Sequence, residues 1–85
     1  MTWKLYIIQA KSGKLYTGIT TDLKRRFIEH LNNKRGAKFF HFSEPDFILY
    51  EESFLNRAEA SKREYQIKKM SRKKKLELIA SIIQK

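Results

Sequence analysis

The sequence of 85 residues contains no cysteine, one proline and three glycines. Without cysteine the chain has no disulfide, no thiolate metal site and no thiol nucleophile. No apolar run approaches the roughly 18 residues that a membrane-spanning helix needs. The first residues, MTWKLYIIQAK, lack the basic start and the small-residue cleavage site of an export signal. We therefore expect a cytoplasmic protein that is neither exported nor embedded in a membrane.

The chain carries a large excess of positive charge. The chain has 19 lysines and arginines against 9 aspartates and glutamates, a formal net charge of +10. Such a surplus on a small surface attracts a polyanion, and nucleic acid is the commonest polyanion in a cell. Hydrophobic residues make up 41% of the chain, which favours a folded unit over a disordered basic tail. The length allows a single domain, residues 1–85, with a small core.

Apolar spacing and chain breakers predict the element order ββαβαα and an α+β fold with a small, mainly antiparallel sheet. The predicted strands are Trp3–Ala10, Leu15–Thr20 and Phe47–Tyr50 or slightly beyond. The predicted helices start at Thr21 or Asp22, at Asn56 and at Ser71, residue types that cap helices. Their apolar positions are Leu23, Phe27 and Leu31 in the first helix and Leu76, Ile79 and Ile83 in the last. Residues 34–46 are expected to form a loop, and the second helix is expected to end near Lys69.

The turn between the first two strands decides which side chains share a face of the sheet. A three-residue loop at 11–13, with Gly13 in the left-handed conformation, places Tyr6 and Tyr16 on the same face. A two-residue Ser12-Gly13 turn separates them. The sequence alone leaves both registers open.

One carboxylate conflicts with the pattern of the second helix. Counting 100° per residue from Ala60, Ile67 lies at about 340° and Glu64 at about 40°, so Glu64 falls within the apolar stripe. A carboxylate that is buried there needs a partner, a metal ion or the mouth of a cleft. The alternative is a structural ion pair, or a residue at the rim whose head reaches water.

Basic residues gather on the first helix and around the start of the last. Arg26 and His30 lie four residues apart, beside the apolar stripe of the first helix. Arginine can grip a phosphate and histidine can move a proton near neutral pH, although a solvated helix edge is the simpler interpretation. Cations in the first turn of a helix oppose its dipole, which favours a phosphate-facing role for the run at 72–75 over a merely solubilising one. The candidate nucleic-acid-binding residues are Lys24, Arg25, Lys68, Lys69, Arg72, Lys73, Lys74 and Lys75.

These residues together resemble the GIY-YIG nuclease superfamily. Lys4-Leu5-Tyr6 and Tyr16-Thr17-Gly18 match its two short motifs in part, and Arg26, His30 and Glu64 follow in the expected order. The stretches LYTGITTDLKRR, EH, GAKF, EASKRE and IKKMSRKKKLELI are similar to small stand-alone bacterial proteins of the URI-type branch. The resemblance covers nearly the whole chain.

The resemblance implies a DNA endonuclease domain with one divalent cation, Mg²⁺ or Mn²⁺, held by Glu64. It also implies that Tyr6 and Tyr16 activate the attacking water, that Arg26 stabilises the phosphate, and that His30 assists. This chemistry suits the residues, because Mg²⁺ accepts one carboxylate together with waters and phosphate oxygens. A repair or recombination role on branched or single-stranded DNA follows from the same resemblance.

The chain departs from the family pattern at three places. Lys4 stands where the first motif has glycine, Ile19 stands where some members have lysine, and no asparagine follows Asn56. The length leaves no room for a separate recognition domain, so binding should be weak, salt-sensitive and largely independent of sequence unless a protein partner supplies recognition. The alternatives are a nucleic-acid-binding module with little catalysis, acting on DNA or RNA, and a structural basic protein on RNA or the ribosome.

Overall fold

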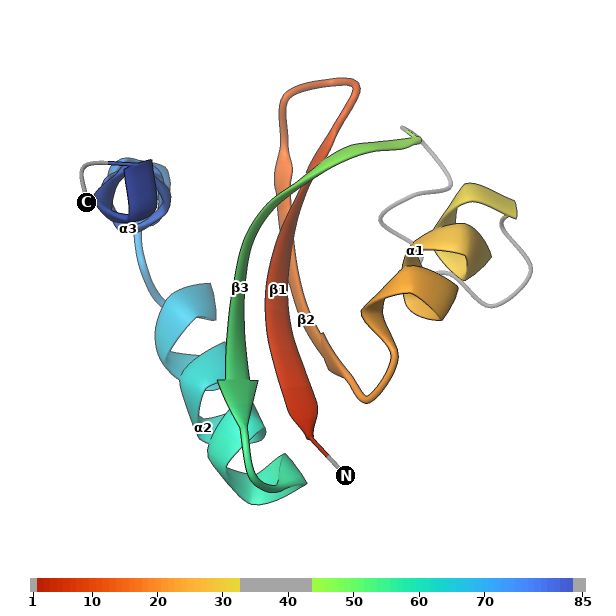
Figure 1. Cartoon of the computed structure of the whole chain (residues 1–85). Coiled ribbons are helices and arrows are strands. Elements are labelled where there is room, and N and C mark those ends of the chain that lie inside the picture. The colour runs from red at the N-terminus through yellow and green to blue at the C-terminus, as the bar shows by residue number, and fades with distance from the viewer. Residues whose placement is uncertain (1, 33–43, 84–85) are drawn as a thin grey trace.

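The computed structural model describes residues 2–32 and 44–83 (Figure 1). Its elements are β1 (Trp3–Ala10), β2 (Leu15–Thr20), α1 (Leu23–Asn32), β3 (Pro45–Phe54), α2 (Arg57–Lys68) and α3 (Arg72–Ile83). The predicted α+β class and the order ββαβαα are confirmed. None of the helices in the described residues is long and apolar enough to cross a membrane.

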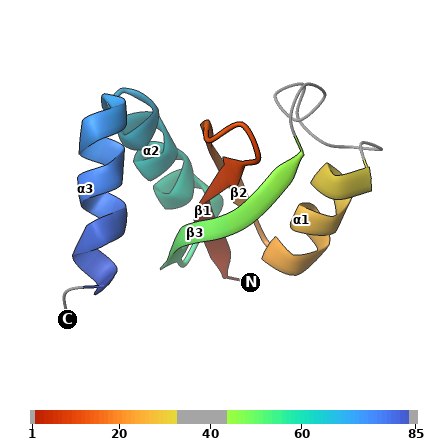
Figure 2. The ribbon, with the colours of Figure 1, turned by 90° about the horizontal axis from the view of Figure 1, so that it is seen from above.

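The three strands form one antiparallel sheet in the order β2-β1-β3. Helix α1 lies on one side of this sheet, and α2 and α3 lie on the other (Figures 1 and 2). Because helices cover both faces, the central strand β1 is buried on both of its sides. Strand β2 is at one edge of the sheet, which is important for the candidate site.

Alternation along β1 divides the core into two clusters. Leu5 and Ile7 point towards α2 and pack with Tyr50 and Ile67. Tyr6, Ile8 and Ala10 point towards α1, where Tyr16, Leu23 and Phe27 pack against them. One tyrosine of β1 is therefore inserted between the sheet and α1.

The hairpin uses the three-residue loop. Gly13 has a φ of 92°, in the left-handed region that favours glycine, and its N–H donates to the carbonyl of Ala10 at 2.8 Å. The register pairs Ile8 with Tyr16 and Tyr6 with Gly18. Tyr6 and Tyr16 consequently share the face that α1 covers.

Each helix begins at a capping side chain that the sequence predicts. The Asp22 carboxylate accepts from the backbone N–H of Arg25 at 3.0 Å, which selects Asp22 over Thr21 as the cap of α1. Asn56 accepts from the N–H of Glu59 at 2.9 Å, and Ser71 accepts from the N–H of Lys74 at 3.2 Å. Local hydrogen bonds thus determine where the helices start.

Two expectations about element boundaries and faces need correction. Strand β3 begins at Pro45 rather than Phe47, because β1 supplies partners from Ala10, opposite Pro45, to Trp3, opposite Phe54. In α3, Leu76 is 42% exposed, whereas Leu78 and Ile79 pack against the core. The buried side of α3 depends on how the helix docks, which periodicity does not specify. Most of the predicted loop, residues 34–43, and the side chain of Ile83 lie outside the described residues.

Candidate functional site

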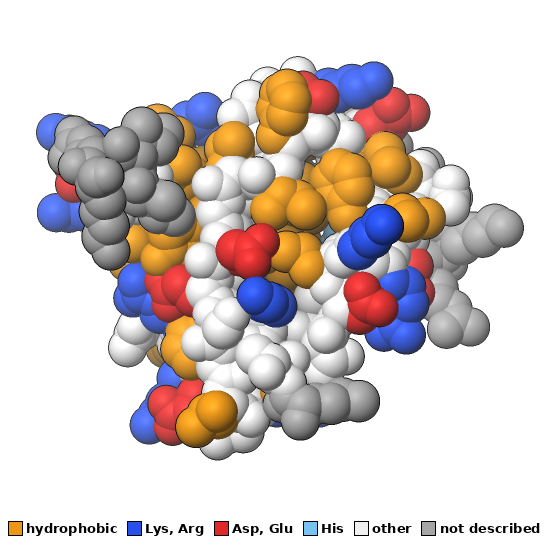
Figure 3. Space-filling model, viewed as in Figure 1, with side chains coloured by type: hydrophobic (Ala, Val, Ile, Leu, Met, Phe, Trp, Pro, Cys, Tyr) orange, Lys and Arg blue, Asp and Glu red, His pale blue; other side chains and the backbone are white. Residues whose placement is uncertain are grey.

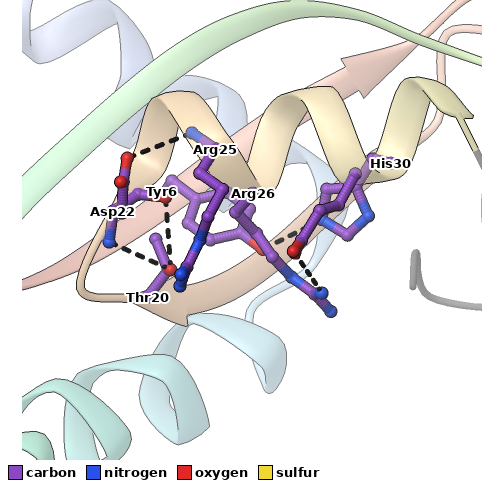
Figure 4. A network of polar contacts seen from close by, with 7 residues as sticks. Tyr6, Thr20, Asp22, Arg25, Arg26 and His30 are labelled. Atoms are coloured by element: carbon purple, nitrogen blue, oxygen red, sulfur yellow. Dashed lines mark hydrogen bonds and ion pairs between the residues drawn. The ribbon is translucent and has the colours of Figure 1, made fainter. Parts of the chain in front are cut away.

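The two motif tyrosines and His30 form a compact cluster under α1. The ring centroids of Tyr6 and Tyr16 are 6.2 Å apart, and that of His30 lies 6.2 Å from Tyr6 and 5.5 Å from Tyr16. The Tyr6 hydroxyl and Nε2 of His30 are within hydrogen-bond distance at 3.1 Å (Figure 4). Tyr6 is 1% exposed and His30 is fully buried, so the two side chains are packed tightly between the sheet and α1.

Gly18 makes room for the Tyr6 ring. A Cβ atom at position 18 would stand 2.5 Å from the Tyr6 hydroxyl oxygen and 3.2 Å from the Tyr16 ring. The Tyr6 ring therefore lies across β2, with its hydroxyl above Gly18, near the edge of the sheet. In the sequence, Gly18 stands out only as part of the second short motif. A glycine inside a strand, which often marks a close approach, was the available signal.

The pKa of the Tyr6 hydroxyl depends on charged residues from both sides of the sheet. Burial is the largest cause of a rise in the pKa of Tyr6 to about 12, to which negative charge on Tyr16 and Glu64 contributes. The Arg26 guanidinium opposes it through hydrogen bonding and through its positive charge. Arg26 belongs to α1 and Glu64 to α2, on the opposite face. Charges from both faces of the sheet therefore bear on the pKa of this one hydroxyl.

His30 is a neutral base in this environment. Burial, followed by the positive charge of Arg26, lowers its pKa to about 4, although the charge of Glu29 partly counteracts them. At neutral pH the imidazole therefore carries no charge and can accept a hydrogen bond at Nε2.

Arg26 is held at the opening of the site. Its guanidinium donates to the Glu29 carboxylate at 3.1 Å, and its side chain is 28% exposed. It lines an open pocket of about 460 Å³ at the end of β2. A partly exposed guanidinium at a pocket wall is suited to contact a phosphate.

Glu64 is partly exposed and paired, which is one of the alternatives that its position in the helical stripe left open. Its neighbours in the stripe, Ala60 and Ile67, are fully buried, while the Glu64 side chain is 23% exposed. Its carboxylate is 3.2 Å from the ammonium of Lys68, one turn later. The ion-pair interpretation of Glu64 thus has a partner in Lys68. The charge of Glu64 also contributes, as the smallest of the effects, to the raised pKa of Tyr6.

The donor set limits the metal chemistry that the site can support. Within residues 2–32 and 44–83 there is no group of three or more His, Asp or Glu side chains that could hold a metal ion. A single carboxylate does not make a zinc site. It does fit Mg²⁺ or Mn²⁺, which keep several waters and take further oxygens from a substrate phosphate.

The predicted nucleic-acid-binding residues fall into separate places. Arg25 joins Arg26 in the pocket at the end of β2. Arg72 and Lys75 lie at the start of β2, where they line an open pocket of about 220 Å³ with Lys14 and Leu15. The guanidinium of Arg72 donates to the carbonyl of Gly13 at 3.0 Å. Basic residues therefore occupy both ends of the edge strand.

The remaining predicted basic residues are on helix surfaces. Lys68 is paired with Glu64, and the Lys69 ammonium lies 4.2 Å from the centroid of the Tyr65 ring. Lys24 and Lys73 are exposed, and Lys74 is 3.9 Å from the Glu77 carboxylate. The structure adds Trp3 and Arg57 to the pocket that holds Arg25 and Arg26. In the sequence, Asn56 and the residues after it predict only the start of a helix.

Comparison with known proteins gives one consistent result. A model of the GIY-YIG catalytic domain matches residues 2–77. A UPF0213 protein of Staphylococcus saprophyticus is 47% identical over 76 residues, which are 89% of this chain and 92% of the relative. A UPF0213 protein of Clostridium perfringens is 46% identical over 77 residues, 91% of this chain and 82% of the relative. The solution structure of a UPF0213 protein from Bacillus halodurans, 38% identical, has a TM-score of 0.61 and covers 94% of this chain and 84% of that one.

Proposed function

Because the chain belongs to the GIY-YIG catalytic-domain family, a family of nucleases, we propose that it is a metal-dependent endonuclease that hydrolyses DNA phosphodiester bonds. The observation that carries the proposal is the Tyr6–His30 pair, joined at 3.1 Å, whose hydroxyl has its pKa lowered by Arg26 and raised by the charge of Glu64. It combines a proton acceptor, a cation for the phosphate and a carboxylate for a metal ion.

Tyr6 and His30 would handle the proton of the attacking water. At neutral pH the Tyr6 hydroxyl is protonated, since its pKa is raised to about 12. It can pass its hydrogen to the neutral imidazole of His30 while it takes one from the water, so that no free phenolate is required. Tyr16, packed beside both rings, orients the pair and offers a second hydroxyl.

Arg26 and Glu64 would manage the negative charge. Arg26, oriented by its bond to Glu29, contacts the phosphate oxygens on which charge develops as the water attacks. Glu64 would hold one Mg²⁺ or Mn²⁺ together with waters, which requires that Lys68 release the carboxylate. When bound, such a cation lowers the pKa of a coordinated water and neutralises charge on the phosphate.

Binding would depend on the basic surface at both ends of β2. Contacts of arginine and lysine with phosphates fix the strand without reading its bases. We therefore propose a preference for branched or single-stranded DNA over a defined sequence, as a repair or recombination nuclease needs. RNA offers the same phosphates and is a second possible ligand.

A second candidate function is a nucleic-acid-binding module whose catalysis depends on a partner. Two observations favour it. The Tyr6 pKa is far above neutrality, and Glu64 is engaged with Lys68. A partner that reorganised these groups would then control the activity.

The deciding experiment is cleavage of supercoiled and branched DNA in Mg²⁺ or Mn²⁺ by the wild type and by Glu64→Gln and Arg26→Ala. Each substitution should reduce the rate at least about 100-fold, because each removes a group that acts on the phosphate or its metal. Glu59→Gln is the matched control on the same helix, since glutamine also serves at the third position of a helix. Cleavage that survives in both site variants would refute the site, and binding without cleavage in the wild type would favour the module.

A further inference from the structure

The pocket beside Arg26 extends well beyond the catalytic candidates. It has a volume of about 460 Å³ and lies where β1 begins, β2 ends, and α1 and α2 begin (Figure 1). Its lining residues are Trp3, Ile19, Thr20, Thr21, Arg25, Arg26, Glu29 and Arg57. None of the roles described above uses Trp3 or Arg57.

The pocket has an excess of positive charge. Three arginines face one carboxylate, and that carboxylate, Glu29, already accepts from Arg26 at 3.1 Å. Arg25 and Arg57 are exposed, and neither forms an ion pair with a carboxylate of the described part of the chain. Their charges are available to an anion.

Neither arginine stands at a position where its charge would stabilise its helix. Arg57 is the first residue of α2 and Arg25 is the third of α1. The positive end of a helix dipole disfavours cations at these positions. Among the described residues, the acids near the two helix starts, the Asp22 cap of α1 and Glu59 in the first turn of α2, form no ion pair with either guanidinium.

Trp3 positions Arg57. The central guanidinium carbon of Arg57 lies 5.7 Å from the centroid of the Trp3 ring. Trp3 is half-buried on β1, so its ring is a fixed platform. A cation held over an aromatic face loses less freedom when it binds a ligand.

We propose that Arg25 and Arg57 form a second phosphate subsite, which binds the backbone phosphate next to the one at Arg26. The ligand is the same nucleic-acid strand, so the inference rests on the proposed function for the identity of that strand. Arg26 lines the pocket as well, which makes the subsite continuous with the candidate active site. Arg57 contacts the phosphate, and Trp3 is a positioning residue that holds Arg57.

The test is binding of a short single-stranded oligothymidylate, labelled with fluorescein, in a buffer with EDTA so that no cleavage occurs. Arg57→Gln should weaken binding about fivefold to tenfold and reduce the slope of log affinity against log salt by about 0.7, the value for one single-strand phosphate contact. Arg57→Lys should keep the slope. Lys62→Gln removes one exposed charge from the same helix outside the pocket and should change the slope far less.

Trp3 gives a local readout, since it is the single tryptophan of the chain. Its fluorescence should change when the unlabelled oligonucleotide binds, and the change should be lost in Arg57→Gln. Circular dichroism of each variant establishes that the fold is intact, as expected for an exposed residue.

The subsite is overturned if Arg57→Gln matches Lys62→Gln in affinity and slope. If the wild type cleaves DNA but Arg57→Gln behaves like Lys62→Gln, the subsite proposal is refuted and the nuclease proposal is supported. If binding depends on Arg57 but the wild type does not cleave DNA, the subsite proposal is supported and the nuclease proposal is refuted. If the protein binds no polynucleotide, both the subsite and the nuclease proposals are refuted.

Discussion

Gly18 determines where the Tyr6 hydroxyl can lie. A methyl group at this position would stand 2.5 Å from the hydroxyl oxygen, and the Tyr6 ring, 1% exposed, has little space to move. Gly18→Ala should therefore destabilise the fold by about 1–3 kcal/mol, the usual cost of overpacking, and move Tyr6 away from His30. Urea unfolding measures the first effect and DNA cleavage the second. An alanine variant with unchanged stability and activity would contradict this role.

His30 gives stability a specific dependence on pH. Its pKa is about 4 in the folded protein, where Arg26 and Glu29 face it along with the two tyrosines, and 6.5 is its ordinary value. Below pH 6.5 the unfolded chain binds a proton that the folded protein does not, so stability should fall as the pH drops from about 6.5 to about 4. We expect a loss on the order of 3 kcal/mol from this group.

His30→Gln is the variant that isolates this contribution. The difference in unfolding free energy between wild type and variant should shrink as the pH falls through this window. Proton NMR of the wild type should show one histidine resonance, absent in the variant, that titrates near the lowered pKa. A His30 resonance that titrates at the ordinary histidine pKa would exclude a buried neutral imidazole.

Individual residues of the site were accessible to sequence reasoning to different degrees. Glu64 could be found because a carboxylate within an apolar stripe conflicts with the helical period. Arg57 could not be found from the sequence, because an arginine at the start of a helix forms no unusual sequence pattern. Its contact with the Trp3 ring is apparent only in the structure. The same holds for the burial of His30, which beside an apolar stripe could equally be solvated.

At the scale of elements, the hairpin turn positions both tyrosines. Gly13 has a φ of 92°, and a Cβ there would meet nothing within 4 Å, so an alanine suffers only from the backbone conformation. Gly13→Ala should cost about 1 kcal/mol in the free energy of unfolding. Denaturation by urea should show a lower midpoint with an unchanged slope.

Ser12→Ala is the neighbouring control. Its hydroxyl accepts from the N–H of Lys14 at 3.4 Å, a long bond, so its loss should matter less. Equal stability of the wild type and Gly13→Ala would mean that the turn adopts another conformation in solution.

The edge strand β2 organises the site because helices approach it from opposite faces. Tyr16 and Gly18 face α1, while Ile19 packs with the cluster that includes Ile67 of α2. Helix α1 and its arginines follow β2 directly in sequence. Helix α2 arrives only after β3, so its place beside β2 depends on the packing of the whole sheet.

At the scale of the whole molecule, the net charge of +10 should govern nucleic-acid binding. On the face shown in Figure 3, acidic and basic side chains lie beside one another rather than forming a continuous basic surface. Several acids are already paired, such as Glu51 with Lys4 and Glu52 with Arg63. The basic residues at the two ends of β2 are the better candidates to contact a strand.

Affinity for DNA should therefore depend strongly on salt and little on sequence. With about four phosphate contacts, raising the salt from roughly 50 to 200 mM should weaken single-strand binding about 10- to 100-fold. Fluorescence anisotropy with two unrelated oligonucleotides of equal length provides the measurement. A large preference for one of them, or a flat salt dependence, would indicate base readout instead.

The sequence by itself determined the elements of this protein and their order, the capping residues and the basic character. These properties depend on interactions within a few residues, or on composition, and can be read locally. Only the tertiary structure decided that Tyr6 lies across Gly18, that Arg26 and Glu64 act on one hydroxyl from opposite sides of the sheet, and that Trp3 supports Arg57. Those relations join residues far apart in the chain, and their geometry depends on how the helices dock on the two faces of the sheet.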